Sequence, residues 1–469
     1  MPVPSYAFLA FSAVAAILIN ISSAPWWRRT LLLVANLAFF LTFAHGVLDV
    51  VPFAGLLAFG FASVKLLESG KRRAAGAALI VILLLAFFWF KRYAFVPGAL
   101  LLPFPYVAIG MSYVFFRVLH LVIDAWQEAL PQRVGPVTYI NYTLNFTCLV
   151  SGPIQMFAAY LKSESESPPK LDWVSAAWGL QRIITGFFKV SVVSALLFSL
   201  HERTLAAVSP NMAFTERAIY ASLLLAIFPI YLYFNFSGYT DFVIGVARFL
   251  RLELPENFDR PFFATSVIDF WGRWHMTLST WLKTYVYSPL LLTMMRRFPA
   301  TGVQPYLGVI AYFVTFFLVG AWHGQTLKFL FFGLLTGLGI SLNKLYEILA
   351  AKKLGRPAYR QLIASPLHSS LSRGLNFLWF CFTMLWFWST LPQLHQLEAQ
   401  IGLSAIGTAF AAVLVVAALG LTCAMNLTDR LPVFSPYMKT AWYTALAVVT
   451  ISCTAVLNAP APHIVYKAF

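Results

Sequence analysis

The feature that most constrains this chain is the recurrence of apolar runs long enough to cross a membrane. A helix needs about 20 apolar residues to span the hydrocarbon core of a bilayer. Only 11% of the 469 residues are charged, against about a quarter in soluble domains. Including further ambiguous stretches, the sequence predicts an all-α integral membrane protein with about ten to twelve transmembrane helices. The clear runs are residues 6–22, 30–48, 75–90, 174–200, 217–236, 305–320, 372–391, 403–424 and 440–457.

We attribute the formal net charge of +16 to the orientation of the chain in the membrane and not to binding of an acidic partner. Arg28 and Arg29, then Lys71, Arg72 and Arg73, follow apolar runs, and the positive-inside rule puts such residues on the cytoplasmic side. No basic residue precedes the first run, so we expect it to stay as the first membrane helix with its N-terminus outside. Nucleic-acid binding is not expected, because the basic residues flank apolar helices and do not form a stripe.

No soluble domain and no internal repeat is visible. We expect residues 1–105 to form N-terminal transmembrane helices, 106–350 a functional core, and 351–469 a C-terminal loop with further transmembrane helices. Inside the core, residues 234–283 carry about twice the chain's average share of charge. Charged, irregular backbone at membrane depth persists only where protein shields it or water reaches it. The segment therefore predicts short and re-entrant helices that build a site; its charged residues are Asp241, Arg248, Arg251, Glu253, Glu256, Asp259, Arg260, Asp269, Arg273 and Lys283.

A histidine interrupts the apolar run "FFLVGAWHGQTLKFLFFG" at residue 323. Burying an ionisable side chain in a bilayer costs a few kcal/mol, so His323 should face a cavity or a polar partner. Gly320 and Gly324 allow backbone or ligand to come close to the imidazole. Histidine suits proton transfer near neutral pH, and His323 could take a proton from a hydroxyl that attacks an activated acyl group. The alternative is a structural histidine, hydrogen-bonded between helices.

A second histidine that also follows a tryptophan is His275, in "DFWGRWHMTLSTWLKTYVYSP". Aromatic and leucine residues recur around it at spacings of three and four, which predicts a helix with a bulky packing face. A catalytic role and a packing role, with the imidazole anchored to a carboxylate such as Asp269, fit equally well. Arg273 is expected to pair with Asp269 or to bind phosphates of a donor. Neither histidine has metal-ligand spacing, so no metal site is expected.

Three motifs in order carry a resemblance to a known family. They are "FNFSGYTDFVIGVARFLRLELPENFDRPF", "FWGRWHMTLSTWLKTYVYSPL" and "GAWHG", preceded by "GMSYVFFRVLHLVIDAW" and "SGPIQMF". Together they span roughly residues 106–340 and resemble the bacterial branch of the membrane-bound O-acyltransferases. That branch includes alginate O-acetylation proteins and the D-alanyl transfer protein of teichoic acids.

The resemblance implies a ring of helices around a thin partition, crossed by a tunnel. It implies His323 as the catalytic residue and His275 as the second site residue, with contacts to substrate from Trp322, Arg273, Trp274 and Ser279. No bound cofactor is implied. The co-substrate would be an acyl thioester on coenzyme A or on a phosphopantetheinyl carrier protein, entering from the cytoplasm. A polysaccharide, or a periplasmic transferase, would meet the protein on the outer side of the cell (inner) membrane.

The expected reaction is transfer of a short acyl group, most simply acetyl, to a hydroxyl of an extracytoplasmic polysaccharide or cell-envelope glycan. Thr336 and Gly337 stand where alginate-type relatives tend to have a second histidine–glycine pair, so the acceptor stays open. One alternative is D-alanyl transfer from a carrier protein to a cell-envelope polymer. Another is a non-enzymatic protein, either a scaffold or a transporter. Paired halves with broken helices would favour the transporter, and the sequence shows no such symmetry.

Overall fold

The computed structural model describes residues 1–70, 73–93, 95–102, 104, 106–166, 168–430 and 434–457. Within these ranges the regular structure is helical, apart from one isolated antiparallel bridge between Phe258 and Trp274. Backbone contacts divide the chain into two compact units. Unit 1 comprises Met1–Val190, Phe236–Glu256 and Ala445–Phe469, and unit 2 comprises Ser191–Asn235 and Asn257–Thr444. The three-part division predicted above has different boundaries and concerns function, so it stays a prediction.

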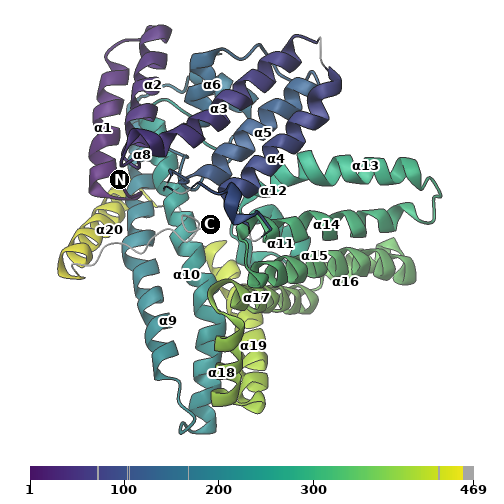
Figure 1. Ribbon diagram of the computed structural model, residues 1–469. Helices are drawn as coiled ribbons and strands as arrows, with labels where there is room; N and C mark the ends of the chain where they lie inside the picture. Colours follow the sequence, from purple (N-terminus) through teal and green to yellow (C-terminus); the bar gives the residue numbers. More distant parts are fainter. Residues whose placement is uncertain are drawn as a thin grey trace. The chain divides into compact units, whose positions relative to one another are not determined.

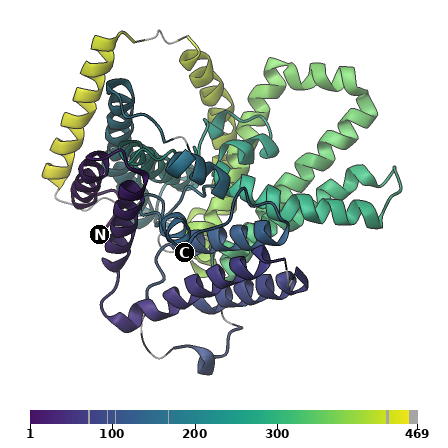
Figure 2. The same ribbon diagram turned by 90° about the horizontal axis from the view of Figure 1, so that it is seen from above.

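Unit 1 contains the first eight α-helices and the part of α10 from Phe236 onward. Its helices α3, α4 and α5 lie side by side in both views (Figures 1 and 2). The elements are α1 (Tyr6–Asn20), α2 (Pro25–Leu41), α3 (Val47–Glu68), η1 (Arg73–Ala75), α4 (Gly76–Phe90), η2 (Gly98–Leu100), α5 (Met111–Trp126), α6 (Pro136–Thr143), α7 (Phe157–Leu161), η3 (Lys162–Glu166), α8 (Trp173–Phe188), the start of η4 (Lys189–Ser194) and the larger part of α20 (Pro436–Leu457).

Unit 2 contains α9, the first half of α10 and the helices from α11 to α19. Helices α14 and α15 run antiparallel against each other (Figure 1). The elements are α9 (Ala195–Ala207), α10 (Phe214–Phe249, shared with unit 1), η5 (Pro261–Phe263), α11 (Val267–Arg273), α12 (Met276–Leu282), η6 (Lys283–Tyr287), α13 (Ser288–Arg297), α14 (Gln304–His323), α15 (Leu327–Leu354), α16 (Arg356–Ala364), α17 (Pro366–Trp388), α18 (Leu391–Ile401) and α19 (Leu403–Thr428).

Six helical segments in the described part of the chain are long and apolar enough to cross a membrane, and α1 and α4 are shorter apolar helices. The predicted run 30–48 is divided between α2 and α3, since Asp49 accepts hydrogen bonds from the backbone nitrogens of His45 and Gly46 and starts a new helix there. The six segments are Val47–Glu68, Trp173–Ala207, Phe214–Phe249, Gln304–His323, Leu327–Leu354 and Leu403–Thr428.

The charged residues predicted at the first cytoplasmic turn take up different positions. Arg28 is buried, and its guanidinium donates to the carbonyl oxygens of Ser163, Glu164 and Arg251. Arg29 lies 3.6 Å from the Glu164 carboxylate. Arg28 thus ties α2 to the chain after α7 and α10, a packing role that the positive-inside argument does not include. Two of the predicted residues, 71 and 72, lie outside the described residues.

Within unit 1, helices α8 and α10 touch backbone to backbone along a seam of glycines. A Cβ on Gly186 would lie 2.5 Å from the carbonyl oxygen of Gly238, and a Cβ on Gly245 would lie 2.5 Å from that of Gly179. Small residues allow this close approach between membrane helices.

Between these glycine contacts, Asp241 of α10 forms ion pairs with Arg182 at 2.9 Å and with Lys189 at 2.6 Å. Asp241 lies inside α10 and joins this helix to α8 and η4.

Candidate active site

The helix predicted through residues 269–289 is interrupted at His275. The backbone of His275 is left-handed, with φ 44° and ψ 51°, and it separates α11 from α12. A non-glycine residue in this conformation costs on the order of 1–3 kcal/mol and persists only where its surroundings enforce it. The side chain is 1% exposed. His275 therefore stands at a buried corner between two short helices and not on the face of one helix, which corrects the periodicity argument.

The corner is fixed by the preceding loop. The Met276 backbone nitrogen donates to the carbonyl oxygen of Asn257 at 3.0 Å. The side-chain oxygen of Asn257 accepts from the Thr277 hydroxyl at 2.6 Å and from the Thr277 nitrogen at 3.3 Å. On the other side of His275, the Asp259 nitrogen donates to the Arg273 carbonyl oxygen at 3.0 Å. The "PENFDRP" loop thus holds both flanks of His275.

His323 is the last residue of the membrane-length helix α14. It is 3% exposed, and its ring lies among aromatic side chains from other helices. The ring centroids of His323 and Phe332 are 5.4 Å apart, and those of His323 and Phe387 are 5.0 Å apart, both edge to face. These rings keep bulk water from most of the imidazole and limit its orientations.

Glycine contacts between α14 and α15 determine where His323 lies. A Cβ on Gly320 would lie 2.3 Å from the carbonyl oxygen of Phe329 and 2.4 Å from the Cα of Gly333. A Cβ on Gly324 would lie 2.3 Å from the ring of Phe329. The close contact predicted at Gly320 and Gly324 is therefore made by α15. This helix packs against Gly320, one turn before His323, and against Gly324, directly after it.

Trp322 connects the two histidines. Its ring centroid lies 6.4 Å from that of His275 and 4.5 Å from that of His323. Aromatic rings interact over such distances. The structure therefore brings together three of the predicted site residues, which come from two sequence motifs, one at the α11–α12 corner and one at the end of α14.

The other three predicted site residues lie around the α11–α12 corner. Arg273 donates to Asp269 at 2.8 Å, and both side chains are about one-third exposed, so the predicted pair forms. Trp274 is 2% exposed and packs against Phe270 and Phe380, within the aromatic core of unit 2. The Ser279 hydroxyl donates to the Trp274 carbonyl oxygen at 3.4 Å. These positions leave the substrate-contact roles of the three residues as predictions.

A cavity of about 270 Å³ lies beside α12. Ser279 lines it, as does Met276, which directly follows His275, whereas the two histidines are not among the lining residues. Its polar lining includes Tyr287 and Tyr312, whose ring centroids are 4.4 Å apart. The complete lining is Ile268, Trp271, Gly272, Met276, Ser279, Thr280, Leu282, Lys283, Tyr287, Tyr312, Thr315, Phe316 and Ile340.

Sequence reasoning did not identify Phe387 or the two tyrosines as neighbours of the site. Phe387 comes from α17, and its carbonyl oxygen accepts a hydrogen bond from Lys328 at 3.2 Å, which fixes it beside His323. No local pattern pairs residues so far apart. Tyr287 could have been identified from the sequence, because it lies in "YVYSP", the end of the stretch quoted around His275. Among the described residues, no group of three or more His, Cys, Asp or Glu side chains is arranged to hold a metal ion.

The chain is similar to several known proteins. The family model described as "MBOAT, membrane-bound O-acyltransferase family" matches residues 34–372. Relatives include "Teichoic acid D-alanyltransferase" of Bacillus subtilis (strain 168), 29% identical over 48% of this chain and 56% of that protein. "Probable alginate O-acetylase AlgI" of Azotobacter vinelandii is 30% identical over 56% of this chain and 48% of that protein. "Peptidoglycan O-acetyltransferase" of Helicobacter pylori is 31% identical over 47% of this chain and 41% of that protein.

The chain spans about half the length of these curated relatives. The family match, however, covers more than half of this chain and includes both histidine motifs. With its membrane-length apolar helices, the chain is a multi-pass membrane protein. It belongs to the membrane-bound O-acyltransferase family.

Proposed function

We propose that this protein is an O-acyltransferase that moves a short acyl group, acetyl in the first instance, from a cytoplasmic thioester to a hydroxyl of an extracytoplasmic polysaccharide. The observation that carries the proposal is that Trp322 packs against two buried histidines, His275 and His323, in a member of this family. Relatives named as alginate and peptidoglycan O-acetylases support acetyl as the acyl group.

In the proposed reaction His323 is the base. Its imidazole takes the proton of the acceptor hydroxyl while that oxygen attacks the thioester carbonyl. The tetrahedral intermediate collapses, the carbon–sulfur bond breaks, and the thiolate takes the proton back from the imidazolium. No covalent acyl-enzyme forms, and the imidazole ends as it began. The aromatic surround of His323 supports this scheme, because excluding water disfavours hydrolysis of the thioester.

His275 is proposed as the second catalytic residue. Its strained backbone and the Asn257 loop hold its ring against Trp322. A polar ring fixed in this way can donate a hydrogen bond to the carbonyl oxygen that becomes negatively charged, which is the usual means of stabilising such a transition state. Trp322 is proposed to keep the two imidazoles apart, so that each can meet a different atom of the reacting groups.

The donor is proposed to be coenzyme A or the phosphopantetheine of a carrier protein. The cavity lined by Met276 and Ser279 is a candidate place for the slender pantetheine arm. The relative named as a teichoic acid D-alanyltransferase makes D-alanyl transfer the second candidate reaction. Both use the same proton transfer at His323 and differ in the acyl group and in its carrier.

The test compares wild type with His323→Ala and His201→Ala. His201 is a matched control because it is also buried and also packs edge to face on a tryptophan, Trp388, at 4.6 Å. Acyl groups are released from cell-surface glycans with mild base and identified by mass spectrometry, after membrane levels are equalised. We expect acetate to disappear in His323→Ala and to persist in His201→Ala.

Loss of released D-alanine in place of acetate would select the carrier-dependent reaction. Unchanged release of both acids in His323→Ala would reject the enzyme and leave transport or scaffolding. An equal loss of released acetate in His323→Ala and His201→Ala would show that acyl transfer needs a buried histidine for packing and not the proton transfer proposed for His323.

A further inference from the structure

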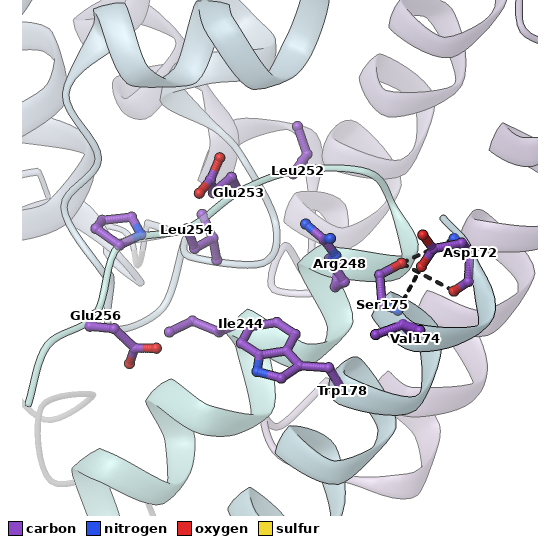
Figure 3. Close-up of a pocket in the computed structure, with 11 residues that line it drawn as sticks. Asp172, Val174, Ser175, Trp178, Ile244, Arg248, Leu252, Glu253, Leu254 and Glu256 are labelled. Carbon is purple, nitrogen blue, oxygen red and sulfur yellow. Dashed lines mark hydrogen bonds between the residues drawn. The ribbon is translucent and has the colours of Figure 1, made fainter. Parts of the chain in front are cut away.

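Unit 1 contains a cavity of about 640 Å³ that none of the proposed catalytic residues lines (Figure 3). It lies between the first turns of α8, the end of α10 and the extended segment that follows α10. Its walls are both charged and apolar. The lining residues are Asp172, Val174, Ser175, Trp178, Ile244, Arg248, Leu252, Glu253, Leu254, Pro255 and Glu256.

Two of the three carboxylates in the cavity already have partners. Asp172 caps α8, and its carboxylate accepts from the Ser175 nitrogen at 2.8 Å. The hydrogen bonds from Ser175 hold the pKa of Asp172 below its usual range, so this group is ionised at neutral pH. Glu256 forms a bidentate pair with Arg182, both bonds at 2.8 Å. Neither carboxylate is left to attract a ligand by itself.

The other two charged groups face the cavity without such partners. Among the described residues, the guanidinium of Arg248 makes no hydrogen bond or ion pair; it lies 6.0 Å from the ring centroid of Trp178. Glu253 accepts a hydrogen bond from Gln155 through its backbone oxygen, which leaves its carboxylate available in the described structure. Figure 3 shows Arg248 between Glu253 and the Asp172–Ser175 pair. One cationic and one anionic group are thus available in the same cavity.

One side of the cavity lies at the exposed start of α8. Val174 lines the cavity and is 80% exposed, and Trp173 beside it is 92% exposed. Both lie at the start of the membrane-length segment Trp173–Ala207. Tryptophans at the end of a membrane helix mark the level of the lipid headgroups. The cavity therefore opens where headgroups and the first carbons of acyl chains are found.

We propose that this cavity binds the headgroup of a zwitterionic phospholipid that carries a primary ammonium, as in phosphatidylethanolamine. The phosphate is held by Arg248, the ammonium by Glu253, and the acyl chains run along Val174 and Trp173. A purely anionic headgroup would satisfy Arg248 but would face three carboxylates. A cation alone would leave the Arg248 guanidinium without a hydrogen-bond acceptor, which is costly for a partly buried charge. This proposal is independent of the acyl transfer proposed above.

The test titrates the purified full-length chain, in detergent micelles, with three phospholipids of identical acyl chains and counts bound lipids by native mass spectrometry. Phosphatidylcholine keeps both charges but has no N–H donor, and phosphatidylglycerol keeps the phosphate but has no cation. We expect phosphatidylethanolamine to bind about tenfold more tightly than either, the effect of one charge-assisted hydrogen bond. Equal binding of the three lipids would overturn the proposal.

Two variants separate the two contacts. Glu253→Gln should abolish the preference for phosphatidylethanolamine over phosphatidylcholine, and Arg248→Gln should weaken all three lipids. Glu398→Gln and Arg203→Gln, at exposed sites in other helices, should change nothing. Glu253 is exposed and its backbone bond to Gln155 does not need the carboxylate, so this variant should fold. A preference that survives in Glu253→Gln overturns the assignment.

A water-soluble competitor tests whether the site belongs to a lipid. Glycerophosphoethanolamine has the same phosphate and ammonium but no acyl chains. We expect it to displace the lipid only at concentrations at least about a hundredfold higher, because burial of acyl CH₂ groups adds to the affinity of the lipid. Displacement at equal concentration would overturn the lipid assignment and identify a site for small zwitterions.

Discussion

Replacing Gly320 with alanine inserts one methyl group where α14 and α15 touch. The new Cβ would lie 2.3 Å from the Phe329 carbonyl oxygen and 2.4 Å from the Gly333 Cα, whereas ordinary contact begins at 3.4 Å. Both obstructing atoms are backbone, so no side chain can rotate away. The two helices must separate by about 1 Å. His323 lies three residues further along α14 and moves with it.

A displacement of about 1 Å at a catalytic group can lower the rate about a hundredfold. Overpacking of this kind also costs about 1–3 kcal/mol of stability. We therefore expect Gly320→Ala to insert in the membrane and to transfer acyl groups about a hundredfold more slowly. Gly333→Ala tests the same contact from α15, because its Cβ would lie 2.6 Å from the Phe317 carbonyl oxygen. It should give a loss of similar size.

The control is Gly407→Ala in α19, where an added Cβ meets no atom within 4 Å. Alanine is the better helix former, so this variant should keep full activity and unchanged or higher thermal stability. Release of glycan-bound acyl groups is measured per mole of monodisperse protein, as judged by size-exclusion chromatography. More than half of wild-type activity in Gly320→Ala would refute the idea that backbone contact positions His323.

Three further variants test other parts of the structure. Asp241→Asn removes the ion pairs that Asp241 makes with Arg182 and Lys189 and should cost about 3 kcal/mol, measured as a lower melting temperature. Asn257→Ala removes both hydrogen bonds to Thr277, which should lower the free energy of unfolding by about 2 kcal/mol and also lower the transfer rate. A lower rate with an unchanged melting temperature would contradict this expectation. Trp322→Phe should keep more of the transfer rate than Trp322→Ala, since a ring would still separate the two imidazoles; equal rates would argue against that role.

The sequence was sufficient for the class of fold, whereas the roles of the site residues stay predictions. Apolar runs and a low share of charge predict membrane helices, because backbone polar groups must pair within the segment in lipid. The expectation of short helices in the charged segment was confirmed for its second part by η5, α11 and α12, whereas residues 234–249 belong to the long helix α10. Trp322 and His323 could be named because an ionisable residue in an apolar run is an anomaly visible without coordinates.

The left-handed backbone at His275 could not be read from the sequence. The aromatic spacing continues across the break, so periodicity indicates one helix, and only the hydrogen bonds from Asn257 impose the corner. The neighbours of His323 were out of reach for a related reason. Phe387 approaches through the packing of α17, and such long-range pairing depends on tertiary contacts that a single sequence does not encode locally.

The glycine seam of unit 1 restricts where insertions and deletions can occur in α8 and α10. Gly179 and Gly186 are two helical turns apart on α8, as are Gly238 and Gly245 on α10, with Asp241 clasped between them. Inserting one residue would rotate everything beyond it by about 100° and turn side chains into the places where backbones now meet. Helices α8 and α10 can therefore make both glycine contacts in only one register. Sequence drift should therefore accumulate in the connecting loops, while the number of residues between the paired glycines stays constant.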